Sequence, residues 1–138
     1  ALPALPPYSL TPLRLAAGAP PDLPALIATP ERLENAYLAL TFNAAGDLVA
    51  IYDKEHGRHV LAEGAQGNQF QAFHDAPRMF DAWNIDPLDE LPFESAAPAE
   101  SIRVIEVGAL RATLEIVRRI KSSLIRQRVS LSAHSLVG

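Results

Sequence analysis

The last third of the chain alternates apolar and polar residues, and this pattern constrains the fold more than any other feature. In residues 110–116 apolar side chains take every second position, and residues 125–133 repeat that period with Gln127 as the one polar member of the set. Side chains of a strand point alternately to the two faces of a sheet, so a period of two predicts strands with one buried and one wet face. Lys121-Ser122-Ser123 between the runs favours a hairpin, and residues 102–107 predict a third strand.

A helix over residues 110–121 is the alternative interpretation, because Leu110, Leu114 and Val117 also lie at helical spacing. The run is rich in β-branched residues and begins without a capping residue, so a strand is favoured.

Short alternating runs also fill residues 33–61. Leu38, Leu40 and Phe42 share one face of a predicted strand, residues 48–52 return, and a short run follows at 58–61. The connecting turns contain Gly46 and Gly57, which can adopt a positive φ without a Cβ clash. We therefore predict an all-β fold, an antiparallel β-sandwich over residues 31–138.

The first 30 residues differ in composition, with eight of the 12 prolines and only two charged residues. Proline lacks a backbone donor and is rare in helices and central strands. We expect an extended proline-rich arm over residues 1–30, with one candidate strand at 8–15. We also expect the sandwich to be truncated at its C-terminus, leaving an exposed strand edge through which a second copy would pair as a homo-oligomer.

Composition excludes several classes of protein. The chain has 138 residues, 49% of them hydrophobic, which suffices for one domain with a core. It contains no apolar run near the roughly 20 residues that span a bilayer, so we expect no membrane insertion. A net charge of −4 disfavours nucleic acid as a partner. The absence of cysteine rules out disulfides and thiolate zinc sites, and it favours a cytoplasmic location.

Charge is distributed unevenly between two stretches of the sequence. Residues 75–100 hold seven acidic side chains and one arginine, whereas residues 103–128 hold seven basic side chains and two glutamates. The two stretches are suited to attract each other. The plainer interpretation, which we favour, is that they are solvated loops and strand faces.

Motifs for metal binding, nucleophilic catalysis and phosphate binding are weak or absent. His56 and His59 have a spacing that could serve a metal, but no carboxylate stands at a fixed offset, so two surface histidines around a turn are favoured. His74 and Asp75 would point to opposite faces of a strand. No serine lies in a Gly-x-Ser-x-Gly elbow, and no glycine-rich loop leads into a helix.

Residues 75–87 combine carboxylates with the only tryptophan, the two ingredients of a sugar site. Pro77 and Pro87 bracket this segment, which predicts a long loop, and we take Trp83, Asp81 and Asp86 as candidate substrate-binding residues. The alternative is that Trp83 and Phe80 close the end of the sandwich, while the two aspartates only form turns.

Four motifs follow one another in order between residues 33 and 86: Leu33-Glu34-Asn35, Asp53-Lys54-Glu55-His56-Gly57-Arg58, Gly67-Asn68-Gln69-Phe70-Gln71 and Asp81-Ala82-Trp83-Asn84-Ile85-Asp86. This succession resembles the sandwich region of glycoside hydrolase family 38, the α-mannosidases. Residues 2–8 also resemble the segment that precedes that sandwich, with Pro7 where glycine is usual. Asn84 stands where an acidic residue is common.

The resemblance implies a galactose mutarotase-like supersandwich, of which this chain would be one part. It further implies that the full-length enzyme is a zinc-dependent retaining α-mannosidase whose aspartate nucleophile and zinc ligands lie in an N-terminal catalytic domain absent here. No catalytic residue and no zinc ligand carries over to this sequence, so the chain alone should be inactive and bind no cofactor. The role that carries over is that of Trp83, which would meet the α-mannoside at the rim of the cleft.

Two other hypotheses remain open from the sequence. The chain could be an independent carbohydrate-binding module, because the same tryptophan would lie on a β-sandwich. It could also be a structural interaction domain, a possibility that gains if neither hydrolysis nor sugar binding is observed.

Overall fold

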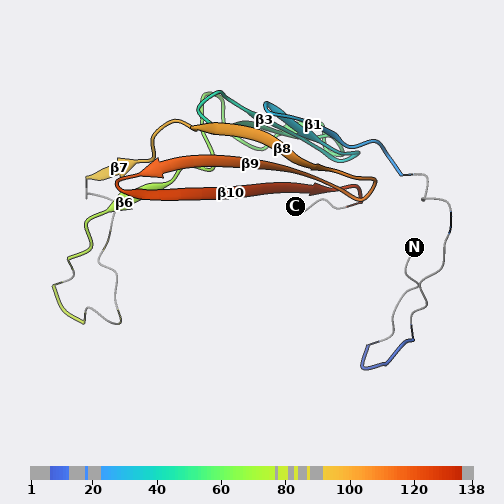
Figure 1. Cartoon of the computed structure of the whole chain (residues 1–138), viewed down its shortest axis with the longest axis horizontal. Coiled ribbons are helices and arrows are strands. Elements are labelled where there is room, and N and C mark those ends of the chain that lie inside the picture. Colours follow the sequence, from blue (N-terminus) through green and yellow to red (C-terminus); the bar gives the residue numbers. More distant parts are fainter. Residues whose placement is uncertain are drawn as a thin grey trace.

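The computed structural model describes residues 7–12, 18, 23–76, 78–80, 83, 87 and 92–134 (Figure 1). The regular secondary structure of the described residues consists of β-strands alone. In chain order these are β1 (Ile27–Thr29), β2 (Arg32–Glu34), β3 (Leu38–Phe42), β4 (Leu48–Asp53), β5 (Arg58–His59), β6 (Gln71–Phe73), β7 (Phe93–Ser95), β8 (Ser101–Val107), β9 (Arg111–Ile120) and β10 (Ser123–Ser132). No helix in the described part of the chain is long and apolar enough to cross a membrane.

Two antiparallel sheets form the body of the molecule. One has the order β1-β2-β3-β4-β5, the other the order β10-β9-β8, and β6 and β7 pair as a separate two-stranded ribbon. The first two strands of the five-stranded sheet contact strands of the three-stranded sheet, so the sheets are layered (Figure 1). The predicted all-β antiparallel sandwich is confirmed.

The predicted hairpin at the end of the chain is the longest paired unit. β9 and β10 pair over ten residues each, from Ile120 with Ser123 to Arg111 with Ser132. Only Lys121 and Ser122 lie outside the paired strands, and Lys121 has a φ of 52°, which a tight two-residue connection can require. The helical alternative for residues 110–121 is therefore wrong, and the strand runs four residues further than the predicted 110–116.

The core lies between the sheets. Leu33, Leu40 and Phe42 from the five-stranded sheet meet residues of β9 and β10 that are almost without solvent exposure, namely Ala112, Leu114, Ile116 and Leu131. All four of the latter stand at the alternating apolar positions of the sequence. The period-two pattern therefore predicted the inner face of this sheet correctly.

The outer face of β9 corrects an expectation. The alternation predicted a wet face, yet Thr113 and Glu115 are only 4% and 3% exposed. β9 is the central strand of its sheet, and Arg103 of β8 together with Arg126 and Arg128 of β10 reach Glu115 from both sides. Among the described residues, these positions are covered by the long side chains of neighbouring strands and not by a second layer of structure.

The turn between β3 and β4 is closely packed as well as sharply bent. Gly46 has a φ of 83°, and a Cβ placed there would lie 2.8 Å from both Arg118 Nη2 and Ile116 Cγ2. Gly57 in the next turn also has a positive φ, 60°. Both turns match the prediction. At position 46 glycine is required for two reasons, because φ is positive and because there is no room for a Cβ atom.

The N-terminal region is only partly described. Residues 8–12 of the candidate strand at 8–15 form no strand, and Tyr8 and Leu10 are fully exposed. Most of the other residues before 23, and with them half of the expected arm, lie outside the described residues. The strand that does come from residues 1–30 is β1, which forms an edge of the five-stranded sheet.

Candidate functional site

The segment that carries Trp83 is a loop rooted on a small ribbon. β6 and β7 pair from Gln71 with Ser95 to Phe73 with Phe93, so residues 74–92 connect two adjacent strand ends. The rings of Phe73 and Phe93 lie 5.4 Å apart at this root. The ribbon therefore holds both ends of the loop in fixed positions.

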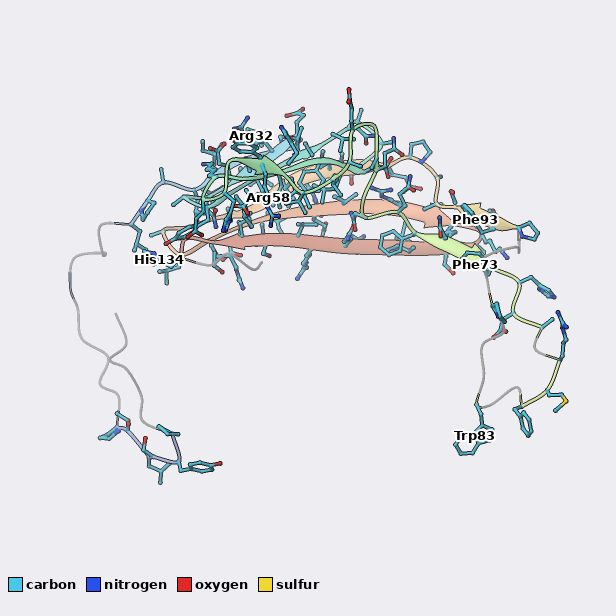
Figure 2. All side chains as sticks on the ribbon, turned by 180° about the vertical axis from the view of Figure 1, so that it is seen from behind. Arg32, Arg58, Phe73, Trp83, Phe93 and His134 are labelled. Atoms are coloured by element: carbon cyan, nitrogen blue, oxygen red, sulfur yellow. The ribbon has the colours of Figure 1, made fainter. Side chains whose placement is uncertain are left out.

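Trp83 is 87% exposed and lies away from the strands (Figure 2). Its backbone N–H donates to the carbonyl of Phe80 at 2.8 Å, and Phe80 is itself 62% exposed. The alternative in which these two aromatic rings close the end of the sandwich is therefore wrong for this structure. Asp81 and Asp86 lie outside the described residues, so their candidacy stays a prediction.

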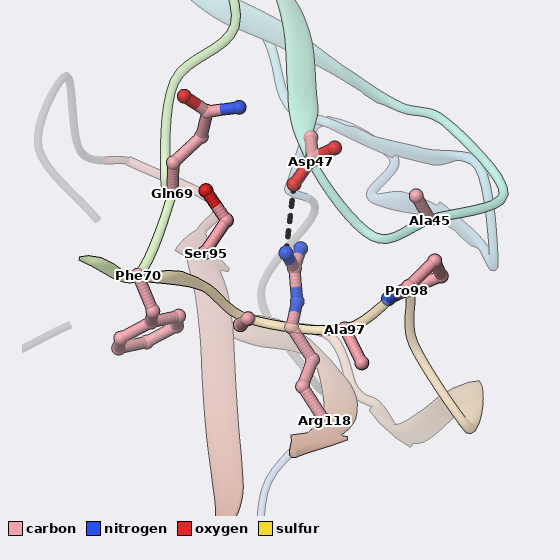
Figure 3. Close-up of a pocket in the computed structure, with 9 residues that line it drawn as sticks. Ala45, Asp47, Gln69, Phe70, Ser95, Ala97, Pro98 and Arg118 are labelled. Carbon is pink, nitrogen blue, oxygen red and sulfur yellow. Dashed lines mark hydrogen bonds and ion pairs between the residues drawn. The ribbon is translucent and has the colours of Figure 1, made fainter. Parts of the chain in front are cut away.

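A cavity of about 200 Å³ lies beside the root of the loop (Figure 3). Its walls come from the β3–β4 turn, from the segment before β6, from the end of β7 and the segment after it, and from β9. The lining residues are Ala45, Asp47, Gln69, Phe70, Ser95, Ala96, Ala97, Pro98 and Arg118.

A buried ion pair forms one side of this cavity. Arg118 Nη1 donates to Asp47 Oδ1 at 2.7 Å, and the two side chains are 4% and 14% exposed. The second oxygen of Asp47 accepts from Asn43 Nδ2 at 3.3 Å. Arg118 Nε and Nη2 are buried and have no hydrogen-bond partner. The pair joins the β3–β4 turn to β9.

The segment from Ala96 to Glu100 links the ribbon to the sandwich through backbone hydrogen bonds. Ala96 donates to Phe70, Ala97 to Arg119, Ala99 to Ala45 and Glu100 to Val117, at 2.8–3.0 Å. The side chains of Arg119 and Glu100 add an exposed pair at 2.6 Å. Among the described residues, this is the one ion pair seen between the acidic and basic stretches of the sequence. Most of the other ion pairs of the basic stretch are internal to it, which supports the plainer interpretation.

Sequence reasoning missed Arg118 and Asp47. The signal that could have revealed Arg118 is its position in the alternation. It is the next inward-facing residue after Ala112, Leu114 and Ile116, and it is charged. A charged side chain on an inward position requires a buried partner. Its partner comes from a turn far away in sequence, so its identity could not be read from the pattern.

The histidines do not converge on a site. His56 Nδ1 lies 2.8 Å from Asp53 Oδ2, while the ring of His59 packs 5.1 Å from that of Tyr52. Hydrogen bonding from the His56 backbone holds the pKa of Asp53 below its usual value. No group of three or more potential metal ligands occurs in the part of the chain that the structure describes.

Comparison with known proteins agrees with the fold. The sequence model of the glycosyl hydrolases family 38 C-terminal domain matches residues 33–136, most of the chain. The chain belongs to this family.

Two curated relatives define the similarity further. Alpha-mannosidase 2C1 of Homo sapiens is 38% identical over 53 residues, which cover 38% of this chain and 5% of the relative. Alpha-mannosidase 2C1 of Mus musculus shows the same identity over the same length. The matched stretch is thus a small part of the length of these relatives.

Proposed function

We propose that this chain is the non-catalytic β-sandwich portion of a zinc-dependent retaining α-mannosidase and that it forms one wall of the mannoside cleft. Membership of family 38 supports the enzyme class. The observation that carries the cleft assignment is the 87% exposure of Trp83 on a loop anchored by the β6–β7 ribbon.

An exposed tryptophan has a physical use in sugar recognition. Its flat ring offers a large apolar face, against which the C–H face of a pyranose packs. Binding residues concentrate on loops held by a rigid scaffold, and the ribbon with its Phe73–Phe93 contact supplies such a scaffold. In this proposal Asp81 and Asp86 contribute polar contacts to the sugar hydroxyls.

The reaction itself belongs to another part of the enzyme in this proposal. The zinc ion and the aspartate nucleophile reside in the N-terminal catalytic domain, and the isolated chain does not hydrolyse mannosides. We place the enzyme in the cytoplasm, in keeping with a sequence that lacks cysteine.

The test uses the full-length enzyme with zinc and an aryl α-mannoside. We expect hydrolysis, and we expect Trp83→Ala to lower kcat/KM about tenfold, the equivalent of roughly 1.4 kcal/mol of lost transition-state binding. Trp83→Phe should keep most of the activity because it preserves an aromatic face. Tyr8→Ala is the matched control, since Tyr8 is a fully exposed aromatic residue outside the loop.

Two results would contradict different parts of the proposal. An enzyme with no turnover would remove the assigned activity. A Trp83→Ala enzyme with unchanged kcat/KM would contradict the cleft assignment alone.

A stability measurement serves as a control for the Trp83→Ala variant. Its free energy of unfolding should change by less than about 0.5 kcal/mol, because the Trp83 side chain is 87% exposed.

The same exposed ring supports a second candidate, an independent carbohydrate-binding module. Trp83 is the only tryptophan, so the fluorescence of the isolated chain reports on it directly. Titration with a mannose oligosaccharide separates the candidates. A saturable change favours the module, and an unchanged signal favours the enzyme portion.

A further inference from the structure

The β6–β7 ribbon that carries the Trp83 loop pairs with no other strand in the described part of the chain. It lies beside the end of the β9–β10 hairpin (Figure 1). Its place relative to the sandwich therefore depends on the two segments that flank it, residues 67–70 before β6 and residues 96–100 after β7. The contacts that hold these two segments also hold the loop with Trp83.

The segment before β6 is tied to both sheets at adjacent residues. Gly67 and Leu48 of β4 exchange backbone hydrogen bonds of 2.8 and 3.2 Å. The side chain of Asn68 reaches Gln127 of β10, and the two amides bond reciprocally, with Asn68 Nδ2 donating to Gln127 Oε1 at 2.9 Å. This amide bridge of Asn68 and Gln127 therefore connects the start of the ribbon to the second sheet.

Gln127 is a polar residue at an inward-facing position of β10. Its neighbours in the alternation, Ile125, Val129 and Leu131, are apolar. A polar group turned inward costs free energy unless it is hydrogen-bonded, and replacing both partners of such a bond by apolar groups is often nearly neutral. Stability alone therefore gives little reason for glutamine at this position, whereas the bond to Asn68 does.

Asn68 has a backbone conformation that few residues adopt. Its φ is 62°, in the left-handed region, which glycine enters without steric cost and which asparagine tolerates better than most other residues. Such conformations persist where the surroundings determine them, as the bonds of Gly67 and the amide bridge do here. Glycine would suit the backbone better, so the position requires the side chain of Asn68.

The segment after β7 is held by backbone bonds to β9 and to the β3–β4 turn. Arg118 and its partner Asp47 face this segment across the cavity. Arg118 is also the next inward residue on β9 after Ile116, which pairs with Gln127. Two polar side chains of the inner face, Arg118 and Gln127, thus lie near each other where the ribbon is attached.

We propose that Asn68 and Gln127 are positioning residues for mannoside binding. Their amide bridge fixes the orientation of the β6–β7 ribbon and so places the Trp83 ring against the sugar, while neither side chain touches the sugar itself. The inference rests on the proposed function, because that proposal gives Trp83 the sugar contact. A shift of about 1 Å in a binding group can lower the rate about 100-fold, so loss of the bridge should be visible in the kinetics.

The test uses the full-length enzyme with zinc and the aryl α-mannoside. Asn68→Gly removes the amide and keeps the left-handed backbone, and we expect kcat/KM to fall about fivefold, less than in Trp83→Ala. Gln127→Met removes the other half of the bridge with a side chain of nearly the same length, and the same loss is expected. In an enzyme that already carries Trp83→Ala, either change should lower kcat/KM by less than about twofold, because no ring is left to place.

Two further measurements separate positioning from a general loss of structure. Thr113→Val removes the hydrogen bonds of Thr113 Oγ1 with Glu106 and Ser130 on the outer face of β9, and it should leave kcat/KM unchanged. Amide exchange over residues 67–73 of the full-length enzyme should be about fivefold faster in Asn68→Gly, because the first connection of the ribbon is loosened.

The outcomes distinguish this inference from the proposed function. Unchanged kcat/KM in Asn68→Gly and Gln127→Met, or losses of the same size with and without Trp83, would overturn the inference and leave the cleft assignment intact. An equal loss in Thr113→Val would do the same. Unchanged kcat/KM in Trp83→Ala would contradict the cleft assignment and with it the role of the bridge in sugar binding. Unchanged exchange over residues 67–73 would overturn the inference in either case.

Discussion

The two faces of β9 are equally buried, but by different means. On the inner face Ala112, Leu114 and Ile116 are shielded by the opposite sheet. On the outer face, in the part of the chain that the structure describes, Thr113 and Glu115 are covered by side chains of the flanking strands. The comparison shows that burial by itself does not identify an apolar core, because a central strand between two arginine-bearing neighbours can hide a carboxylate.

The outer face keeps its charges close to water. Arg103 donates to Glu115 Oε1 from Nη2 at 2.6 Å and from Nε at 3.2 Å, while Arg126 lies 3.4 Å from the same oxygen. The side chain of Glu115 is 4% exposed, whereas that of Arg103 is 61% exposed. The stems of the arginines thus cover the carboxylate while their guanidinium groups stay solvated.

The largest effect should come from truncating the inner face. Leu114→Ala removes a side chain with 0% exposure from the middle of the core, and we expect the free energy of unfolding to fall by about 4 kcal/mol, since partial relaxation leaves a cavity. Urea unfolding measures this change. Leu124→Ala is the matched control, because Leu124 is 43% exposed on β10 and should lose less than about 1 kcal/mol. Equal losses at the two sites would contradict the assignment of the core.

A smaller loss is expected where the inner face ends in a charge. Asp47→Ala leaves Arg118 buried without its carboxylate partner, and removing one member of a buried ion pair costs about 3 kcal/mol. Urea unfolding again measures the change. Glu100→Ala breaks the exposed pair with Arg119 and should cost less than about 1 kcal/mol. If the free energy of unfolding fell equally in the two variants, the buried pair of Asp47 and Arg118 would contribute no more than an exposed surface pair.

The strands were the part of the fold that the sequence could predict. The alternation in residues 110–133 predicted β9, β10 and their inner face because the period of two is a local property of an extended chain. The turns at Gly46 and Gly57 were also predictable, since a positive φ favours glycine. The ordered motifs between residues 33 and 86 predicted the family, which the match over residues 33–136 confirmed.

The interactions that join distant segments could not be predicted. The pairing of Arg118 with Asp47 and the burial of Glu115 depend on which strands become neighbours, and local patterns do not determine that. The short β1 and β2 strands carry too few residues for a period to be visible. The candidate site was predictable only in part, because composition pointed to Trp83 but held no information on its exposure.

The outer face of β9 should make the smallest contribution, and one that depends on pH. The hydrogen bonds from Arg103, followed by the charges of Arg126 and Arg128, hold the pKa of Glu115 below its usual value of 4.5. The unfolded chain, with the higher pKa, therefore takes up a proton first as the pH falls. The stabilisation by Glu115 is complete above the unfolded pKa and disappears as the pH drops through the folded one.

Glu115→Gln keeps the shape of the side chain and removes its charge, so it isolates this contribution. Glu34 and Glu106 also have a lowered pKa, so both proteins should lose stability in acid. The difference in unfolding free energy between the unaltered chain and the variant should be largest near neutral pH and should shrink as the pH falls below 4.5. Urea unfolding at several pH values measures it. A difference that stays constant over this range would mean that the charge of Glu115 contributes nothing to stability. Packing alone would then hold this side chain, as it does on the inner face.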